Sequence, residues 1–155
     1  MSHESPKGAT VEWYTPPEFF TRLGDVEFFM DPASPGKDIV PWVPANIHVT
    51  KDEDGMKSEW VGPVWLNPPY GPDAVPFIDR MLDHRYGMLL IPSRTETAVF
   101  QRAARSAGAV CFLRDRIHFI RGDGYQARSG FASVLMAWGL RYIEALEKAD
   151  LGWMP

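Results

Sequence analysis

Short apolar runs recur along the chain and are separated by polar or amphipathic stretches. These runs predict β-strands at residues 26–30, 47–50, 64–66, 88–91, 110–113 and 132–138. The runs 64–66 and 88–91 contain only apolar residues, which is typical of strands covered on both faces of a sheet. Only a polar segment, 114–130, precedes the last run, so we expect that strand to pair antiparallel with 110–113.

Apolar residues at helical spacing lie between several of these runs. Thr15 and Glu18 form a capping box, with Pro16 at the first helical position and Gly24 after the last turn. Further helices are predicted at 73–83, from 95 or 97 to 107, and around 143–149. Strands that alternate with helices predict an α/β fold whose sheet is covered by helices on both faces.

The length of 155 residues fits one domain, which we expect over 11–155, after a flexible polar segment at 1–10. The net charge of −4 excludes a global basic field, so any contact with nucleic acid must come from a local patch. A single cysteine, Cys111, excludes an intrachain disulfide and favours a reducing cytoplasm. No signal sequence opens the chain and no apolar run approaches the roughly 20 residues of a membrane span, so we expect a soluble, unexported protein.

Side chains that commonly bind metals are scattered along the sequence. His3, His48, His84 and His118 show no ligand spacing with one another or with Cys111. The chain also lacks a glycine-lysine loop for phosphate. We therefore expect neither a metal site nor nucleotide hydrolysis.

A motif of polar, proline and aromatic residues, Asn67-Pro68-Pro69-Tyr70, directly follows the apolar run 64–66. The two prolines remove backbone donors and stop the strand ladder, which leaves nearby carbonyls free to accept hydrogen bonds. In open α/β sheets, ligands bind outside the carboxyl ends of strands. The motif therefore predicts a site that holds a flat group carrying an amine, and the alternative interpretation is a turn that closes the strand.

Five motifs in a fixed order carry a family resemblance: Trp13-x-Thr15-Pro16, Asp31-Pro32-Ala33, Asp54-Gly55-x4-Trp60, Val64-x-x-Asn67-Pro68-Pro69-Tyr70 and Arg116-Ile117-x-Phe119. Together they resemble the small phage-type, Dam-like DNA adenine-N6 methyltransferases, over roughly residues 11–138. The resemblance implies a Rossmann-like methyltransferase fold, S-adenosylmethionine as methyl donor and an exocyclic amine of a DNA base as acceptor. It also implies a phage or prophage gene expressed in the cytoplasm of a bacterial host.

The adenine N6 amine is a poor nucleophile because its lone pair is delocalised into the ring. The side-chain oxygen of Asn67 and the carbonyl of Pro68 are the expected acceptors for its hydrogens, with Pro69 completing the catalytic motif. Tyr70 is expected to stack on a flipped or single-stranded target base. No general base is needed, because the product ammonium loses its proton to water and catalysis comes from positioning and electrostatics.

Cofactor contacts are expected mainly from the motifs near the first two strands. Asp31, in the Asp31-Pro32-Ala33 loop, would pair with the methionine ammonium, unless it only forms a turn. Thr15, Pro16 and the free amides of their helix would bind the methionine carboxylate. An acidic residue, Asp54 rather than Asp52 or Glu53, would accept hydrogen bonds from the ribose, and Trp13 rather than Trp60 or Trp65 would cover the cofactor.

One feature departs from methyltransferases at large, which usually have a glycine-rich loop after the first strand. Residues 31–36 contain a single glycine, Gly36. The small phage-type family resembles the chain better at this position.

DNA contacts must come from loops, because no room remains for a separate recognition domain. The basic residues expected to contact phosphates are Arg94, Arg114, Arg116, Arg121 and Arg128. The alternative interpretation is a solvated loop in which Asp115 and Asp123 balance the arginines. A homodimer would widen the DNA footprint of so small a domain.

Two other functions remain open on the sequence. The same fold could methylate another amine, on RNA, a free nucleotide, cytosine N4 or a protein glutamine. Alternatively, the chain could be a catalytically silent relative that binds DNA or a partner protein.

Overall fold

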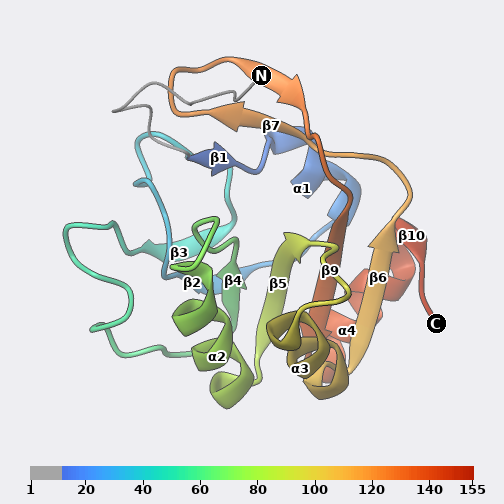
Figure 1. The fold of residues 1–155 in the computed structure, drawn as a ribbon. Coiled ribbons are helices and arrows are strands. Elements are labelled where there is room, and N and C mark those ends of the chain that lie inside the picture. The colour runs from blue at the N-terminus through green and yellow to red at the C-terminus, as the bar shows by residue number, and fades with distance from the viewer. Residues whose placement is uncertain (1–11) are drawn as a thin grey trace.

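A seven-stranded mixed sheet runs through the protein (Figure 1). The computed structural model describes residues 12–155, so the predicted flexible segment 1–10 lies outside the described residues. The strand order is β10-β6-β9-β5-β4-β2-β3. In chain order these strands are β2 (Phe28–Asp31), β3 (Ala45–His48), β4 (Val64–Leu66), β5 (Gly87–Pro92), β6 (Ala109–Leu113), β9 (Ser133–Trp138) and β10 (Gly152–Trp153).

The direction of the strands divides the sheet into a parallel and an antiparallel part. Strands β3, β2, β4 and β5 are parallel neighbours. Strand β9 lies between β5 and β6 and is antiparallel to both, which confirms the predicted antiparallel pairing of the last two apolar runs. As a result, β2, β3, β4, β5 and β6 all end at the same edge of the sheet, which we call the carboxyl edge.

Helices cover both faces of this sheet, as predicted. Helices α1 (Pro17–Leu23) and α4 (Leu140–Ala149) contribute to one apolar core, and α2 (Ala74–His84) and α3 (Ala98–Ser106) contribute to the other. Strand β4 shows the alternation that creates the two cores: Trp65 packs in the first and Val64 and Leu66 pack in the second. This is why the run 64–66 is apolar throughout.

Several predicted boundaries shift. The second strand begins two residues earlier than expected, at Ala45, and α4 begins at Leu140 rather than near residue 143. Thr97, not Thr95, is the N-cap of α3, and its hydroxyl accepts a hydrogen bond from the Phe100 amide at 3.3 Å. Gly24 ends α1 as predicted.

The predicted capping box at Thr15 is wrong. The N-cap of α1 is Pro16, whose backbone is extended, and Pro17 opens the helix. A proline fits both positions because neither needs its amide hydrogen there. Thr15 therefore lies one residue outside the helix, where its buried hydroxyl is free to contact another side chain.

The polar segment 114–130, expected to be a loop, contains two strands. β7 (His118–Arg121) and β8 (Gln126–Arg128) pair antiparallel, and β7 also pairs with β1 (Trp13–Tyr14). These short strands lack a long apolar run because only one side chain of β7, Phe119, is buried. In Figure 1 this three-stranded sheet lies across the carboxyl edge of the main sheet.

No helix in residues 12–155 is both long enough and apolar enough to span a membrane.

Candidate active site

A cavity of about 710 Å³ opens at the carboxyl edge, beside the ends of β2 and β4. It lies there because adjacent parallel strands deliver the residues that follow them to the same place. The cavity brings together ten residues singled out in the sequence: Trp13, Thr15, Asp31, Pro32, Ala33, Asp54, Asn67, Pro68, Pro69 and Tyr70.

The side-chain amide of Asn67 is held in one orientation. Its Nδ2 donates to the Trp13 carbonyl at 3.0 Å and to the Thr15 hydroxyl at 3.3 Å. A carbonyl only accepts hydrogen bonds, so the atom that faces Trp13 must be the amide nitrogen. The Oδ1 atom consequently points elsewhere and is buried without a hydrogen-bond partner in the described structure.

A buried hydrogen-bond acceptor without a partner costs about 1–3 kcal/mol of folding free energy. A ligand that donates a hydrogen bond to this atom would offset the cost. The ligand that would satisfy Asn67 Oδ1 is a hydrogen-bond donor. Because the residue lines the cavity, a donor group of a bound molecule can supply that bond.

Tyr70 is anchored by other aromatic rings. Its ring meets Phe131 edge to face at a centroid distance of 5.5 Å and Phe119 at 6.3 Å. Burial raises the pKa of the Tyr70 phenol well above its usual value, so the side chain is a neutral aromatic surface. Phe131 had no sequence signal beyond being an isolated aromatic residue, and only the fold places it beside Tyr70.

Asp31 is a buried carboxyl group at the end of β2, with 5% of its surface exposed. Its Oδ1 accepts a hydrogen bond from the Ala33 amide at 3.1 Å. Burial outweighs this bond and raises the pKa of Asp31 to about 7. A cationic group brought into the cavity would favour the ionised carboxylate.

The three acidic residues after β3 lie in different environments. Asp54 lines the cavity, whereas Asp52 and Glu53 are exposed outside it. The Glu53 carboxylate already accepts hydrogen bonds from the amide and hydroxyl of Thr50. Of the three, Asp54 is thus the acidic residue that lines the cavity.

The loops that follow β2 and β3 touch through their backbones. A Cβ atom on Gly55 would lie 1.8 Å from the Pro32 carbonyl oxygen, so no larger residue fits at this position without movement. Pro32 and Gly55 both line the cavity. The two loops therefore form one continuous wall.

Two residues expected to bind the cofactor, Pro16 and Trp13, line different cavities. Pro16 is outside the main cavity and lines a smaller one of about 240 Å³, together with Arg116. Trp13 belongs to β1, is half-buried and lines the main cavity. Of the two tryptophans considered less suitable, Trp65 also borders the main cavity and Trp60 is buried in the α2–α3 core.

The five predicted DNA-contacting arginines are exposed and none lines the main cavity. Arg94 and Arg114 follow the ends of β5 and β6 at the carboxyl edge. Arg121 and Arg128 end β7 and β8, and Arg121 lies opposite Trp13 in the register of the small sheet. The three-stranded sheet thus carries basic residues to the side of the cavity.

Three of these arginines already have partners. Arg121 forms an ion pair with Asp123, Arg114 donates to the Asp150 carbonyl at 2.7 Å, and Arg116 donates to the Ser129 carbonyl at 3.4 Å. The side chains of Arg94 and Arg128 make no hydrogen bond or ion pair with other residues in the range 12–155.

The sequence analysis missed other residues that line the cavity, namely Glu12, Tyr14, Ser34, Pro35, Val40, Val43, Lys51, Met56, Asp73, Pro76 and Phe77. Phe77 illustrates why. Its helical spacing predicts a core residue, and it is in fact only half-buried because α2 borders the cavity. Tyr14 could have been suspected from its position next to Trp13.

The residues present fit a ligand of the size and chemistry of S-adenosylmethionine. The cavity volume lies within the roughly 300–1,000 Å³ typical of small-molecule sites. Its lining offers a buried carboxyl group, a second carboxylate, aromatic rings and the unpartnered Asn67 oxygen. Within residues 12–155, no group of three or more His, Cys, Asp or Glu side chains is placed to hold a metal ion.

Comparison with known proteins identifies the family. The family described as DNA N-6-adenine-methyltransferase (Dam) matches residues 3–144, which include the cavity and every strand of the two sheets except β10. No curated protein and no solved structure matches the chain. Since the family match extends over most of the 155 residues and over every element that builds the cavity, the chain belongs to the DNA N-6-adenine-methyltransferase (Dam) family.

Proposed function

We propose that this protein transfers a methyl group from S-adenosylmethionine to the N6 amine of adenine in DNA. The observation that carries the proposal is the buried, unpartnered Oδ1 of Asn67, a residue that lines the cavity at the carboxyl edge of the sheet. A hydrogen-bond donor such as an amine would satisfy this atom.

Asn67 and Pro68 act on the target amine in this proposal. Asn67 Oδ1 accepts one N6 hydrogen and the Pro68 carbonyl accepts the other, so that the nitrogen lone pair is directed away from the ring. Trp13 and Thr15 keep the amide in the orientation this needs, because they accept both hydrogens of Nδ2. Preorganised acceptors of this kind act without rearranging during the reaction.

Tyr70 supports the base in the same scheme. Its ring is fixed by Phe119 and Phe131, so it offers a preformed stacking surface beside Asn67. Stacking of a base on such a ring stabilises the complex by about 1–3 kcal/mol. Pro69, which is exposed between Pro68 and Tyr70, restricts the backbone that presents both neighbours.

The other half of the cavity is assigned to the cofactor. Bound S-adenosylmethionine would supply an electrophilic methyl group on its sulfonium. Asp31 pairs with the cofactor ammonium, Asp54 accepts hydrogen bonds from the ribose, and Trp13 covers the ligand. Pro32 and Ala33 shape the loop that holds Asp31 in place.

The strand arrangement supports a Rossmann-like methyltransferase sheet. Five strands end at one edge, a single antiparallel strand is inserted between β5 and β6, and helices cover both faces. Ligands of open α/β sheets bind at that edge. The cavity and the catalytic motif both lie there.

Methyl transfer to mixed-sequence duplex DNA, followed by nucleoside analysis, tests the proposal. We expect N6-methyladenine with the parent protein and a loss of about 10²–10³ in kcat with Asn67→Ala, as expected when a preorganised polar contact to the transition state is removed. Transfer at the parental rate by Asn67→Ala would contradict the role of the amide. Cofactor binding without methylation of DNA would redirect the search to RNA, cytosine N4 or protein glutamine, and no cofactor binding would favour a silent binding module.

A further inference from the structure

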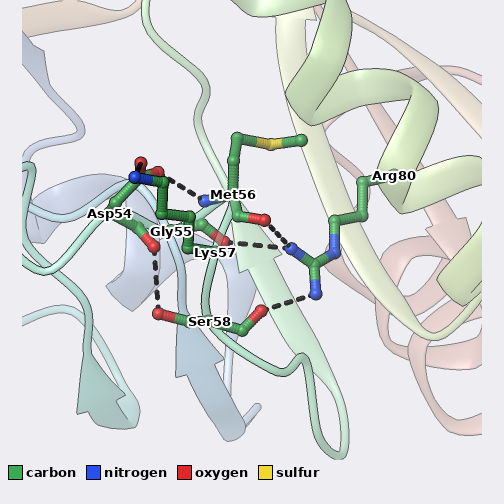
Figure 2. A network of polar contacts seen from close by, with 6 residues as sticks. All are labelled: Asp54, Gly55, Met56, Lys57, Ser58 and Arg80. Carbon is green, nitrogen blue, oxygen red and sulfur yellow. Dashed lines mark hydrogen bonds and ion pairs between the residues drawn. The ribbon is translucent and has the colours of Figure 1, made fainter.

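The side chain of Arg80, in α2, forms hydrogen bonds with backbone carbonyls of the loop that follows β3. Figure 2 shows its guanidinium facing the carbonyls of the Asp54–Ser58 segment. Nη1 donates to the Met56 carbonyl at 2.5 Å and to the Gly55 carbonyl at 3.4 Å, and Nη2 donates to the Ser58 carbonyl at 2.5 Å. Three carbonyl groups of one short loop thus converge on a single side chain.

The positively charged guanidinium of Arg80 interacts with these carbonyls and not with a carboxylate of the described residues. Arg80 forms no ion pair with any residue in the range 12–155. Its guanidinium also lies over the Trp60 ring, 5.0 Å from the ring centroid, and the Trp60 indole nitrogen donates to the Gly55 carbonyl at 2.8 Å. The negative ends of the carbonyl dipoles would repel one another if this charge were absent.

The loop held by Arg80 forms part of the cavity wall. Asp54 and Met56 line the cavity, and Gly55 packs against the Pro32 carbonyl of the loop that follows β2. Asp54 has a φ of 61°, a left-handed conformation that costs free energy in a residue other than glycine. Hydrogen bonds from the Met56 amide to Asp54 Oδ1 and from the Ser58 hydroxyl to the Asp54 carbonyl help to hold it (Figure 2).

We propose that Arg80 is a positioning residue for cofactor binding, which fixes the 54–58 loop so that Asp54 faces the ribose. This inference rests on the proposed function, since it assigns the cofactor to this part of the cavity. Arg80 itself does not line the cavity and acts through the loop. Its removal should therefore weaken the cofactor complex and leave the chemistry of Asn67 intact.

Arg80→Met tests this role, because it keeps the aliphatic length and removes every donor. We expect the KM for S-adenosylmethionine to rise about tenfold or more, with kcat at saturating cofactor within about twofold and the KM for DNA unchanged. The Kd for S-adenosylhomocysteine, measured by calorimetry, should rise by the same factor. Arg80→Lys should recover part of the affinity, since an ammonium reaches fewer carbonyls than the planar guanidinium.

Arg102→Met is the matched control. Arg102 belongs to α3 and forms an exposed ion pair with Asp79 of α2 at 2.8 Å, at the same helix pair but without contacting the loop. We expect its KM and Kd values to stay within about twofold of the parent. Trypsin cleavage after the exposed Lys57 should be faster in Arg80→Met than in Arg102→Met, which reports on the loop without any activity measurement.

Parental Kd and KM values in Arg80→Met and Arg80→Lys would overturn this inference. So would a fall in kcat with an unchanged KM for the cofactor. A parent protein that binds S-adenosylhomocysteine and fails to methylate DNA would contradict the proposed acceptor, while the Kd comparison would still decide the role of Arg80. A parent that binds no cofactor would overturn both proposals.

Discussion

At the scale of single residues, the neighbours of Asn67 determine what its amide can do. The Trp13 carbonyl and the Thr15 hydroxyl receive the Nδ2 hydrogens, and Oδ1 is left for a ligand. The sequence predicts that Thr15 binds the methionine carboxylate at a helix N-terminus. Its hydrogen bond with Asn67 also connects it to the side of the cavity assigned to the target amine.

Thr15→Val distinguishes these two roles. Valine has nearly the same shape but cannot accept the Asn67 hydrogen bond, so the amide becomes less well oriented. We expect kcat to fall about fivefold, the effect of losing a hydrogen bond worth about 1 kcal/mol, while the Kd for S-adenosylmethionine stays the same. The control is Thr15→Ser, which keeps the hydroxyl. An increase in Kd with an unchanged kcat would support the carboxylate-binding role instead.

Asp31 should make cofactor affinity depend on pH. Burial raises its pKa to about 7, so below that pH the cofactor-free protein carries a proton on Asp31. Pairing with an ammonium requires the ionised carboxylate, so affinity should fall as the pH decreases below about 7. Between pH 7 and 5.5, where an α-ammonium with a pKa of about 7.7–8.0 remains charged, we expect a loss on the order of tenfold.

Calorimetric Kd values for S-adenosylhomocysteine across this pH range provide the measurement. Asp31→Asn should bind more weakly than the parent at pH 7 and show no dependence on pH between 5.5 and 7. A parent protein whose Kd is constant over the same range would contradict the pairing of Asp31 with the ammonium.

At the scale of elements, the loops after β2 and β3 behave as one unit because Gly55 lets their backbones meet. Secondary structure alone would not require this contact, since each loop is connected to its own strand. Arg80 of α2 adds a third element to the same unit. The wall of the cavity is consequently defined by contacts between elements far apart in the sequence.

Gly55→Ala should separate the two loops. The added Cβ would lie 1.8 Å from the Pro32 carbonyl oxygen, so backbone must move, at a cost of about 1–3 kcal/mol in the free energy of unfolding. Thermal unfolding should show a lower Tm, and calorimetry a higher Kd for S-adenosylhomocysteine. Gly130→Ala is the control, because an added Cβ there has no neighbouring atom within 4 Å. Equal Tm and Kd values in the two variants would contradict the close contact.

At the scale of the whole molecule, charge is distributed unevenly. The net charge is −4, yet five exposed arginines, Arg94, Arg114, Arg116, Arg121 and Arg128, lie on the small sheet or on segments that follow strands at the carboxyl edge. Arg94 and Arg128 differ from the others, since their side chains have no partner within the described part of the chain. We therefore expect these two arginines to contribute most to phosphate binding.

Salt dependence of DNA affinity tests this distribution. We expect Arg94→Ala and Arg128→Ala each to reduce the slope of log K against log salt by about 0.9, the value for one phosphate contact. Arg121→Ala should have a smaller effect because Arg121 is paired with Asp123. Arg105→Ala, in the last turn of α3 and so at the opposite edge of the sheet, should leave the slope unchanged. Parental slopes in both Arg94→Ala and Arg128→Ala would contradict the assigned DNA surface.

The sequence by itself determined the elements whose information is local. Apolar runs buried on both faces predicted the central strands β4 and β5, Gly24 marked a helix end, and Thr95 or Thr97 marked a helix start, because burial pattern and capping depend on neighbouring residues. The order of the motifs also identified the family. It did not predict β1, β7, β8 and β10, which are too short to be recognised before they pair with neighbouring strands.

Tertiary structure decided which side chains meet. The hydrogen bonds of Asn67 to Trp13 and Thr15, the approach of Gly55 to Pro32 and the contacts of Arg80 with the 55–58 backbone all join segments distant in sequence. No local pattern encodes such pairs, since each depends on where two separate elements are placed by the packing of both cores. The sequence thus supplied the chemical groups of the site, and the fold fixed their orientation.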